Sequence, residues 1–235
     1  GRDREPPAVP WGLVLAAPAL AALLLAATAP PGTLWRVEAF AYDVTSYHLQ
    51  VPREWLAAGA MVPLRHNVYS LFPGLIECAY AQLGAMRGGV ENAIYTAQLF
   101  HATLGVFAAV AAGAAVAELA SPRAAVFTGA ILLSVPWVLV TGSLAYNEMA
   151  VLAFGAAAVM VMLDVRSETW RGAAAIGLLV GVATLAKPTA GPLVAVPVGL
   201  VLLTRLNHAV RWRQPPQMRR ALTAAAVAAT VGLLT

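Results

Sequence analysis

The stretch YDVTSYHLQVPREW, residues 42–55, gathers acids, tyrosines and a histidine directly after a long apolar run. Asp43 has two roles open to it. Its carboxylate can accept backbone N–H bonds as the N-cap of a helix that starts at Val44, or it can act as a general base toward a substrate hydroxyl. Tyr47 and His48 follow one helical turn later, where they either bind the substrate or anchor the helix in the membrane interface.

Two further charges stand alone between apolar runs. Glu148, at the end of TGSLAYNE (141–148), is either an ordinary acid at a helix start or an acid that faces Asp43 across a cavity and binds a substrate or a metal. Lys187, in AKPTAGP (186–192), either extends its ammonium group to the interface or faces a phosphate. A broken backbone at membrane depth is tolerated where it lines a polar cavity, and an ammonium group in such a cavity suits a phosphate.

The stretch RHNVYS, residues 65–70, adds a third group of polar side chains. It is either a plain polar loop surface or a strip that binds phosphate and sugar. On the second interpretation, Arg65 and His66 contact a phosphate group, and Asn67 and Tyr69 contact the substrate. The His, Asp and Glu residues have no spacing typical of a metal site, and whether a divalent metal takes part stays open.

The composition indicates a membrane protein. The chain is 60% hydrophobic and 11% charged, with a mean hydropathy of +0.74, whereas soluble domains carry about 25% charged residues. The basic residues are scattered over loops instead of gathered on one face, which excludes a nucleic-acid partner. Cys78 is the only cysteine, so an internal disulfide is excluded. We therefore predict an all-α fold, a polytopic membrane helical bundle.

The apolar runs predict seven membrane spans, the seventh of them incomplete. The chain has no initiator Met and stops within an apolar run, so we expect residues 1–235 to be the N-terminal part of one transmembrane domain in a longer protein. Gln98 and His101 lie inside the second span, where we expect hydrogen bonds between helices. The spans lie at about 11–29, 94–117, 124–141, 148–164, 171–186, 189–204 and 221–235.

The basic residues predict the orientation of these spans. With alternating spans, ten of the fifteen Arg and Lys residues fall on the side of the N-terminus, and the 205–220 loop holds five arginines and no acid. By the positive-inside rule the N-terminus is cytoplasmic and the 30–92 loop is extracytoplasmic. Membrane lipids are expected partners, and the arginines of the 205–220 loop face their anionic headgroups.

The 30–92 loop carries many aromatic residues and is therefore expected to fold. Three short helices are predicted, at Val44–Gln50, Arg53–Ala60 and Leu75–Met86, separated by Pro52 and by the Pro-Gly pair at 73–74. Aromatic-rich short helices favour the membrane–water interface, so we expect the loop to lie over the outer ends of the spans.

The chain resembles bacterial members of the GT-C superfamily of integral-membrane glycosyltransferases, in the protein-O-mannosyltransferase-like and aminoarabinose-transferase-like branch. The resemblance covers roughly residues 10–205. It rests on the order and placement of D-x-x-x-Y-H-L-x-x-P (43–52), Gly59, NVYSLFPG (67–74), His101, YNE (146–148) and LAKPTAG (185–191). One departure is the Asp-Val pair at 43–44, where many relatives have Asp-Glu.

The resemblance implies an enzyme that moves a sugar from a polyprenyl-phosphate donor to an acceptor, which is a lipid, a glycan or a protein, on the extracytoplasmic side of the cell membrane. It assigns the base role to Asp43, matches Glu148 to a second acidic position, and matches Lys187 to a basic position that faces the donor phosphate. The expected reaction inverts the anomeric carbon. The alternatives are a multi-span transporter, which also builds sites from broken helices, and a non-catalytic subunit of polymer export or assembly.

Overall fold

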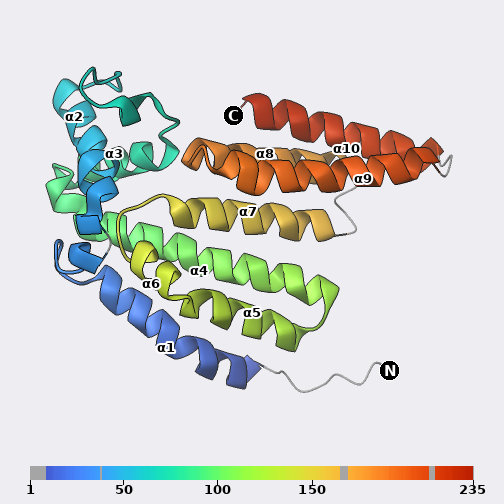
Figure 1. Cartoon of the computed structure of the whole chain (residues 1–235), viewed down its shortest axis with the longest axis horizontal. Coiled ribbons are helices and arrows are strands. Elements are labelled where there is room, and N and C mark those ends of the chain that lie inside the picture. The colour runs from blue at the N-terminus through green and yellow to red at the C-terminus, as the bar shows by residue number, and fades with distance from the viewer. Residues whose placement is uncertain (1–8, 38, 165–168, 212–214, 235) are drawn as a thin grey trace.

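The computed structural model describes residues 9–37, 39–164, 169–211 and 215–234. These residues form a bundle of long helices with a group of shorter helices at one end (Figure 1). No strand occurs in the described ranges, so the predicted all-α class is confirmed. The long helices are α1 (Val9–Ala27), α4 (Ile94–Leu119), α5 (Pro122–Ser134), α7 (Glu148–Leu163), α8 (Trp170–Ala186), α9 (Val196–Arg211) and α10 (Pro215–Leu234).

Small residues let the long helices approach closely. A Cβ atom at Gly113 of α4 would lie 2.7 Å from the carbonyl oxygen of Ala125 in α5. A Cβ atom at Gly177 of α8 would lie 2.5 Å from the carbonyl oxygen of Ala228 in α10. Backbone contact of this kind is typical of helix packing in membranes, where dispersion forces replace the hydrophobic effect as the main attraction between helices.

The helices differ in how well they suit a membrane span. Among the described residues, Glu91–Leu119 and Gly191–His208 are long and apolar enough to cross a bilayer. A third candidate is α5 together with α6 (Pro136–Gly142), a pair bent by 65° where Pro136 cannot continue the preceding helix. Shorter apolar helices occupy Val14–Ala27, Glu148–Leu163 and Trp170–Ala186. A membrane protein fits these helices, whereas the seven-span topology and its orientation stay predictions.

Two buried polar residues of α4 join it to neighbouring helices. Gln98 donates from Nε2 to the carbonyl oxygen of Ala27, at the end of α1, over 2.8 Å. The ring nitrogen Nε2 of His101 accepts the backbone N–H of Met149, in the first turn of α7, over 3.0 Å. The predicted role of Gln98 and His101 in hydrogen bonds between helices is therefore confirmed.

Residues 39–93, hereafter the lid, form the short helices at one end of the bundle (Figure 1). They include η3 (Val44–His48), α2 (Gln50–Ala58), η4 (Val68–Leu71), α3 (Leu75–Arg87) and η5 (Glu91–Ala93). The predicted helix boundary at Pro52 is wrong, because Pro52 lies in the first turn of α2. A proline is tolerated there, since the first N–H groups of a helix have no partner within it.

A buried apolar cluster fixes the lid to the ends of the long helices. Val44, Ile76 and Tyr80 of the lid belong to one cluster with Tyr146 before α7 and Ala186 at the end of α8. The buried phenol of Tyr80 donates to the carbonyl oxygen of Tyr146 over 2.5 Å. These contacts bring η3 and the start of α3 next to the termini of α7 and α8, where Glu148 and Lys187 lie.

Candidate functional site

A cavity of about 380 Å³ lies between the lid and the ends of α7 and α8. Its volume falls in the range of pockets that hold small ligands, roughly 300 to 1,000 Å³. Aromatic side chains form part of its wall, among them Trp55 and Phe72. The polar and titratable side chains that line it include Asp43, Tyr47, Tyr69, Glu77, Asn147, Lys187 and Thr189.

Asp43 lies immediately before η3, but it does not cap that helix. Its backbone is helical, with φ −65° and ψ −39°, and its side chain makes no capping hydrogen bond. The capping alternative is therefore wrong. The carboxylate instead accepts a hydrogen bond at Oδ2 from the phenol of Tyr47 over 3.1 Å. Burial and the neighbouring Asp43 carboxylate raise the pKa of Tyr47, so the phenol stays protonated and keeps donating to Asp43.

His48 lies behind the cavity wall in contact with an acid that sequence reasoning missed. The ring is fully buried, and its Nδ1 is 2.6 Å from Oε1 of Glu77 in the first turn of α3. His48 is not among the cavity-lining residues, whereas Glu77 is. The signal for Glu77 was an acid in the otherwise apolar segment LIECAY at 75–80, where an unpaired charge would be costly.

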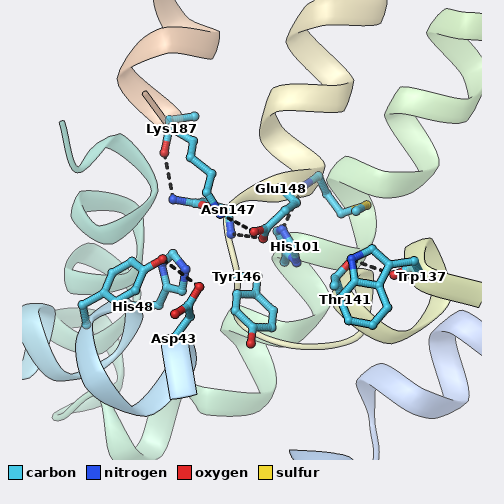
Figure 2. Close-up of polar contacts among 12 residues, drawn as sticks. Asp43, His48, His101, Trp137, Thr141, Tyr146, Asn147, Glu148 and Lys187 are labelled. Atoms are coloured by element: carbon cyan, nitrogen blue, oxygen red, sulfur yellow. Dashed lines mark hydrogen bonds and ion pairs between the residues drawn. The ribbon is translucent and has the colours of Figure 1, made fainter. Parts of the chain in front are cut away.

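Glu148 and Lys187 meet at the junction of two helix ends. Glu148 is the first residue of α7 and Lys187 is the C-cap of α8, positions where the helix dipoles favour an acid and a base respectively. Lys187 Nζ donates to Glu148 Oε1, and the side chains are 22% and 30% exposed (Figure 2). Lys187 lines the cavity, whereas Glu148 does not and lies behind it as the partner of the lysine.

Asn147, directly before α7, also reaches the cavity from the bundle side. Its amide Nδ2 donates to the carbonyl oxygen of Ala186 over 2.9 Å (Figure 2). The bond ties the turn before α7 to the end of α8, next to Lys187. In the sequence Asn147 is recognisable only as part of the motif YNE, and no role of its own is predicted for it.

The stretch at 65–70 divides between the cavity wall and the surface. Tyr69 lines the cavity, and its ring stacks on Tyr47 with centroids 4.4 Å apart and planes 19° apart. Asn67 lies outside the cavity lining and is 9% exposed. It donates to the carbonyl oxygen of Ser46 over 2.8 Å and accepts the N–H of Tyr69 over 3.2 Å. Asn67 thus positions Tyr69.

The structure does not bring Arg65 and His66 into the cavity. Both side chains are exposed, and neither lines the cavity. His66 Nε2 lies 3.1 Å from Glu54 Oε2 on the surface of the lid. Of the predicted site residues, the structure therefore gathers Asp43, Tyr47, Tyr69 and Lys187 at one cavity, with His48, Asn67 and Glu148 directly behind its wall.

Within the described ranges, no three His, Cys, Asp or Glu side chains lie close enough together to hold a metal ion. The cavity combines the Asp43 carboxylate and the Tyr47 phenol, both from the lid, with the Lys187 ammonium group from the end of α8. This arrangement can accept a proton from a hydroxyl group and bind an anion within the same space.

Comparison with known proteins gives one family. The family model described as dolichyl-phosphate-mannose-protein mannosyltransferase matches residues 15–232, nearly the whole chain. The match includes the lid and every residue that lines the cavity. Neither the curated proteins nor the solved structures give a significant match.

Proposed function

The chain belongs to the dolichyl-phosphate-mannose-protein mannosyltransferase family, and on that premise we propose that it transfers a sugar to an acceptor on the extracytoplasmic side of the cell membrane with inversion at the anomeric carbon. Family membership makes the protein a membrane glycosyltransferase with a polyprenyl-phosphate sugar as donor. The transporter and the non-catalytic subunit lose their support with this assignment. The acceptor is a lipid, a glycan or a protein.

One observation carries the proposal. Asp43 from the lid and Lys187 from the end of α8 line the same cavity although they lie far apart in the sequence. Transfer from a sugar phosphate needs a base beside the attacking hydroxyl and a positive charge beside the leaving phosphate. The two residues supply these two groups across a space that fits a small ligand.

Lys187 is the group that we assign to the phosphate. An ammonium group has three N–H donors, and Glu148 takes one of them, so two remain for phosphate oxygens. Glu148 also fixes the direction of the flexible lysine, which lowers the conformational entropy lost when the donor binds. As the bond from the anomeric carbon to the phosphate oxygen breaks, negative charge grows on the phosphate, and a fixed ammonium group stabilises it.

Asp43 is the group that we assign to the acceptor hydroxyl. A carboxylate has about four lone-pair positions, and Tyr47 occupies one of them at Oδ2. The carboxylate is thereby oriented and can still accept a proton. The acceptor oxygen loses its proton to Asp43 and attacks the anomeric carbon from the face opposite the phosphate, which gives inversion. Tyr69, stacked on Tyr47, holds the phenol in place.

The proposed orientation places the N-terminus in the cytoplasm and the lid outside. The arginines of the 205–220 loop support it, because cytoplasmic loops carry the excess of Arg and Lys. The polyprenyl tail of the donor would then lie in the bilayer beside the long helices. The side on which the lid lies is tested with a Glu91→Cys variant in which Cys78 is replaced by Ser, because Glu91 is exposed in η5. A membrane-impermeant thiol reagent should label this variant in intact cells.

The proposed function is tested with the Asp43→Asn variant of the full-length protein. The amide keeps the shape of the carboxylate but cannot take the acceptor proton. We expect the rate of sugar transfer from radiolabelled polyprenyl-phosphate mannose to fall by roughly 1,000-fold, within the range of general-base catalysis. Membranes that contain the variant are compared with wild-type membranes at equal protein content.

Glu91→Gln is the matched control, because it also neutralises an acid of the lid, at an exposed position away from the cavity. It should transfer sugar at the wild-type rate. Donor binding should be intact in Asp43→Asn, since Lys187 and Glu148 are untouched. Wild-type transfer by Asp43→Asn would overturn the assignment of Asp43 as the base.

A further inference from the structure

We propose that Glu77 and Asn147 form a subsite that binds hydroxyl groups of the transferred sugar. The inference rests on the proposed function, because it names the part of the cavity that recognises the sugar of the lipid-linked donor. Two hydrogen-bond acceptors, Glu77 Oε2 and Asn147 Oδ1, are buried in the cavity wall and lack partners. Neither residue has a part in the base and phosphate roles of Asp43 and Lys187.

Glu77 presents one oxygen atom to an internal partner and leaves the other without one. Its side chain lines the cavity, although the residue is only 5% exposed. Oε1 is held by His48 Nδ1 at 2.6 Å, whereas Oε2 is buried and has no hydrogen-bond partner. His48 thus fixes the carboxylate, and its second oxygen is left for a ligand. Burying a carboxylate oxygen without a partner is costly, which favours a donor that arrives with the substrate.

Asn147 repeats this pattern on the bundle side of the cavity. The residue is 4% exposed and lines the cavity. Its Nδ2 donates to the carbonyl oxygen of Ala186, which fixes the orientation of the amide and leaves Oδ1 as the free atom. Oδ1 is buried and has no hydrogen-bond partner. Two residues from different elements therefore each have one anchored atom and one unused acceptor at the same cavity.

The chemistry of the two free atoms selects the ligand group. A carboxylate oxygen and an amide oxygen only accept hydrogen bonds, so their partner must be a donor. Sugar hydroxyl groups donate, whereas an ionised phosphate cannot donate and is repelled by the Glu77 carboxylate. The acceptors therefore complement Lys187, which only donates. Aromatic residues of the wall, including Trp55 and Tyr69, give the apolar faces of a sugar ring a surface to pack on.

A binding measurement without any acceptor tests the inference apart from catalysis. Purified full-length protein is titrated with polyprenyl-phosphate mannose and, separately, with polyprenyl phosphate that carries no sugar, each in competition with a fluorescent polyprenyl-phosphate probe. Wild type should bind the mannose-bearing lipid more tightly. Glu77→Gln replaces the free acceptor by an NH₂ donor at nearly the same shape. It should lose roughly 10- to 100-fold of the affinity for the mannose-bearing lipid, the span expected for one hydrogen bond to a charged group.

The lipid without sugar separates recognition from a general loss of structure. Glu77→Gln should bind it as wild type does, because Lys187 still contacts the phosphate. The control Glu91→Gln should match wild type with both lipids. Equal loss of affinity for both lipids would overturn the inference, since Glu77 would then act on the fold or on Lys187. Unchanged affinity for the mannose-bearing lipid would overturn it as well.

A second measurement needs no variant and remains decisive if Glu77→Gln fails to fold. Wild-type protein is titrated with the monodeoxy analogues of the mannose-bearing lipid, each of which lacks one ring hydroxyl. At least one analogue should bind roughly 10-fold or more weakly, because its missing hydroxyl leaves a buried acceptor unpaired. Equal binding of all analogues would overturn the inference. The proposed function would still stand after that result if Asp43→Asn reduces transfer as expected. A failure of the sugar subsite and a failure of the proposed function are therefore distinguishable.

Discussion

The two ends of the helix bundle both carry a cavity, and they differ in what the cavity walls contain. The end away from the lid has the larger one, about 760 Å³, with exposed Glu118, Trp170 and Arg171 in its wall. The lid end has a cavity of about 380 Å³. Its wall contains buried Glu77 and Asn147, each with an unpartnered atom, and the half-buried Lys187.

Burial of polar groups, more than cavity volume, distinguishes the candidate site from the cavity at the other end of the bundle. A charged side chain on an open surface is solvated by water and needs no further partner. A buried polar atom without a partner is costly, so it indicates a ligand or a function that compensates for the cost. Among the described residues, the buried side-chain atoms without partners are in Ser46, His48, Glu77, His101 and Asn147, all in the lid or in the helix segments next to it.

After the loss of transfer expected for Asp43→Asn, the next largest effect should come from removing the charge of Lys187, the partner of Glu148. Lys187→Met should reduce transfer by roughly 100-fold, because no ammonium group remains to stabilise the leaving phosphate. It also leaves Glu148 half-buried without its partner, which should lower the free energy of unfolding by about 1 to 3 kcal/mol. Transfer from the mannose-bearing lipid and unfolding in detergent measure the two effects.

The double variant Glu148→Gln/Lys187→Met separates chemistry from stability. With both charges gone, part of the lost stability should return, while transfer should stay as low as in Lys187→Met. Normal transfer by the double variant would remove Lys187 from the phosphate site.

Glu54→Gln provides the contrast, because it breaks the surface pair with His66, whose side chain is 66% exposed. This substitution should lower the free energy of unfolding by less than about 1 kcal/mol.

An intermediate effect is expected at the contact between α4 and α5, where stability can be altered without touching the cavity wall. Gly113→Ala places a methyl group 2.7 Å from the carbonyl oxygen of Ala125, so the two helices must separate. The free energy of unfolding should fall by about 1 to 3 kcal/mol, as for other overpacked contacts. Thermal unfolding in detergent measures the change.

Gly199→Ala in α9 is the matched substitution, because its added methyl group meets nothing within 4 Å. It should leave stability unchanged or raise it by about 0.5 to 1 kcal/mol through helix propensity. Both variants should keep the wild-type KM for the donor, since neither residue lines the lid-end cavity. A KM that rises strongly in Gly113→Ala would mean that the cavity depends on the far end of the bundle.

The sequence predicted those parts of the site that stand out against an apolar background. Asp43 and Lys187 are lone charges beside apolar runs, and the cost of charge at membrane depth was enough to single them out. Gln98 and His101 inside an apolar run were likewise enough to predict hydrogen bonds between helices. The helical class followed from the length of the apolar runs and from the scarcity of charged residues.

The sequence could not predict which polar residues of the lid turn inward. Arg65 and His66 look as reactive as Asp43, yet they lie on the surface. Glu77 stands out only as an acid in an apolar segment, and nothing in the sequence pairs it with His48, 29 positions away. Such pairings depend on how η3 and α3 pack against the long helices, and local sequence patterns do not predict this packing.

The smallest effect should come from the cavity at the end away from the lid. Arg171 lies over the ring of Trp170, with its guanidinium carbon 5.5 Å from the ring centroid, and both side chains are exposed. A cation–π contact at an exposed site contributes about 0.5 to 1 kcal/mol. Arg171→Ala should therefore lower the free energy of unfolding by no more than that amount. Transfer should stay within about twofold of wild type, a change smaller than one typical hydrogen bond contributes, because Arg171 does not line the lid-end cavity. Kinetics with the mannose-bearing lipid measure the outcome. A tenfold loss of transfer would show that the larger cavity also takes part in the reaction, and burial of polar groups would then no longer distinguish the functional end of the bundle from the other.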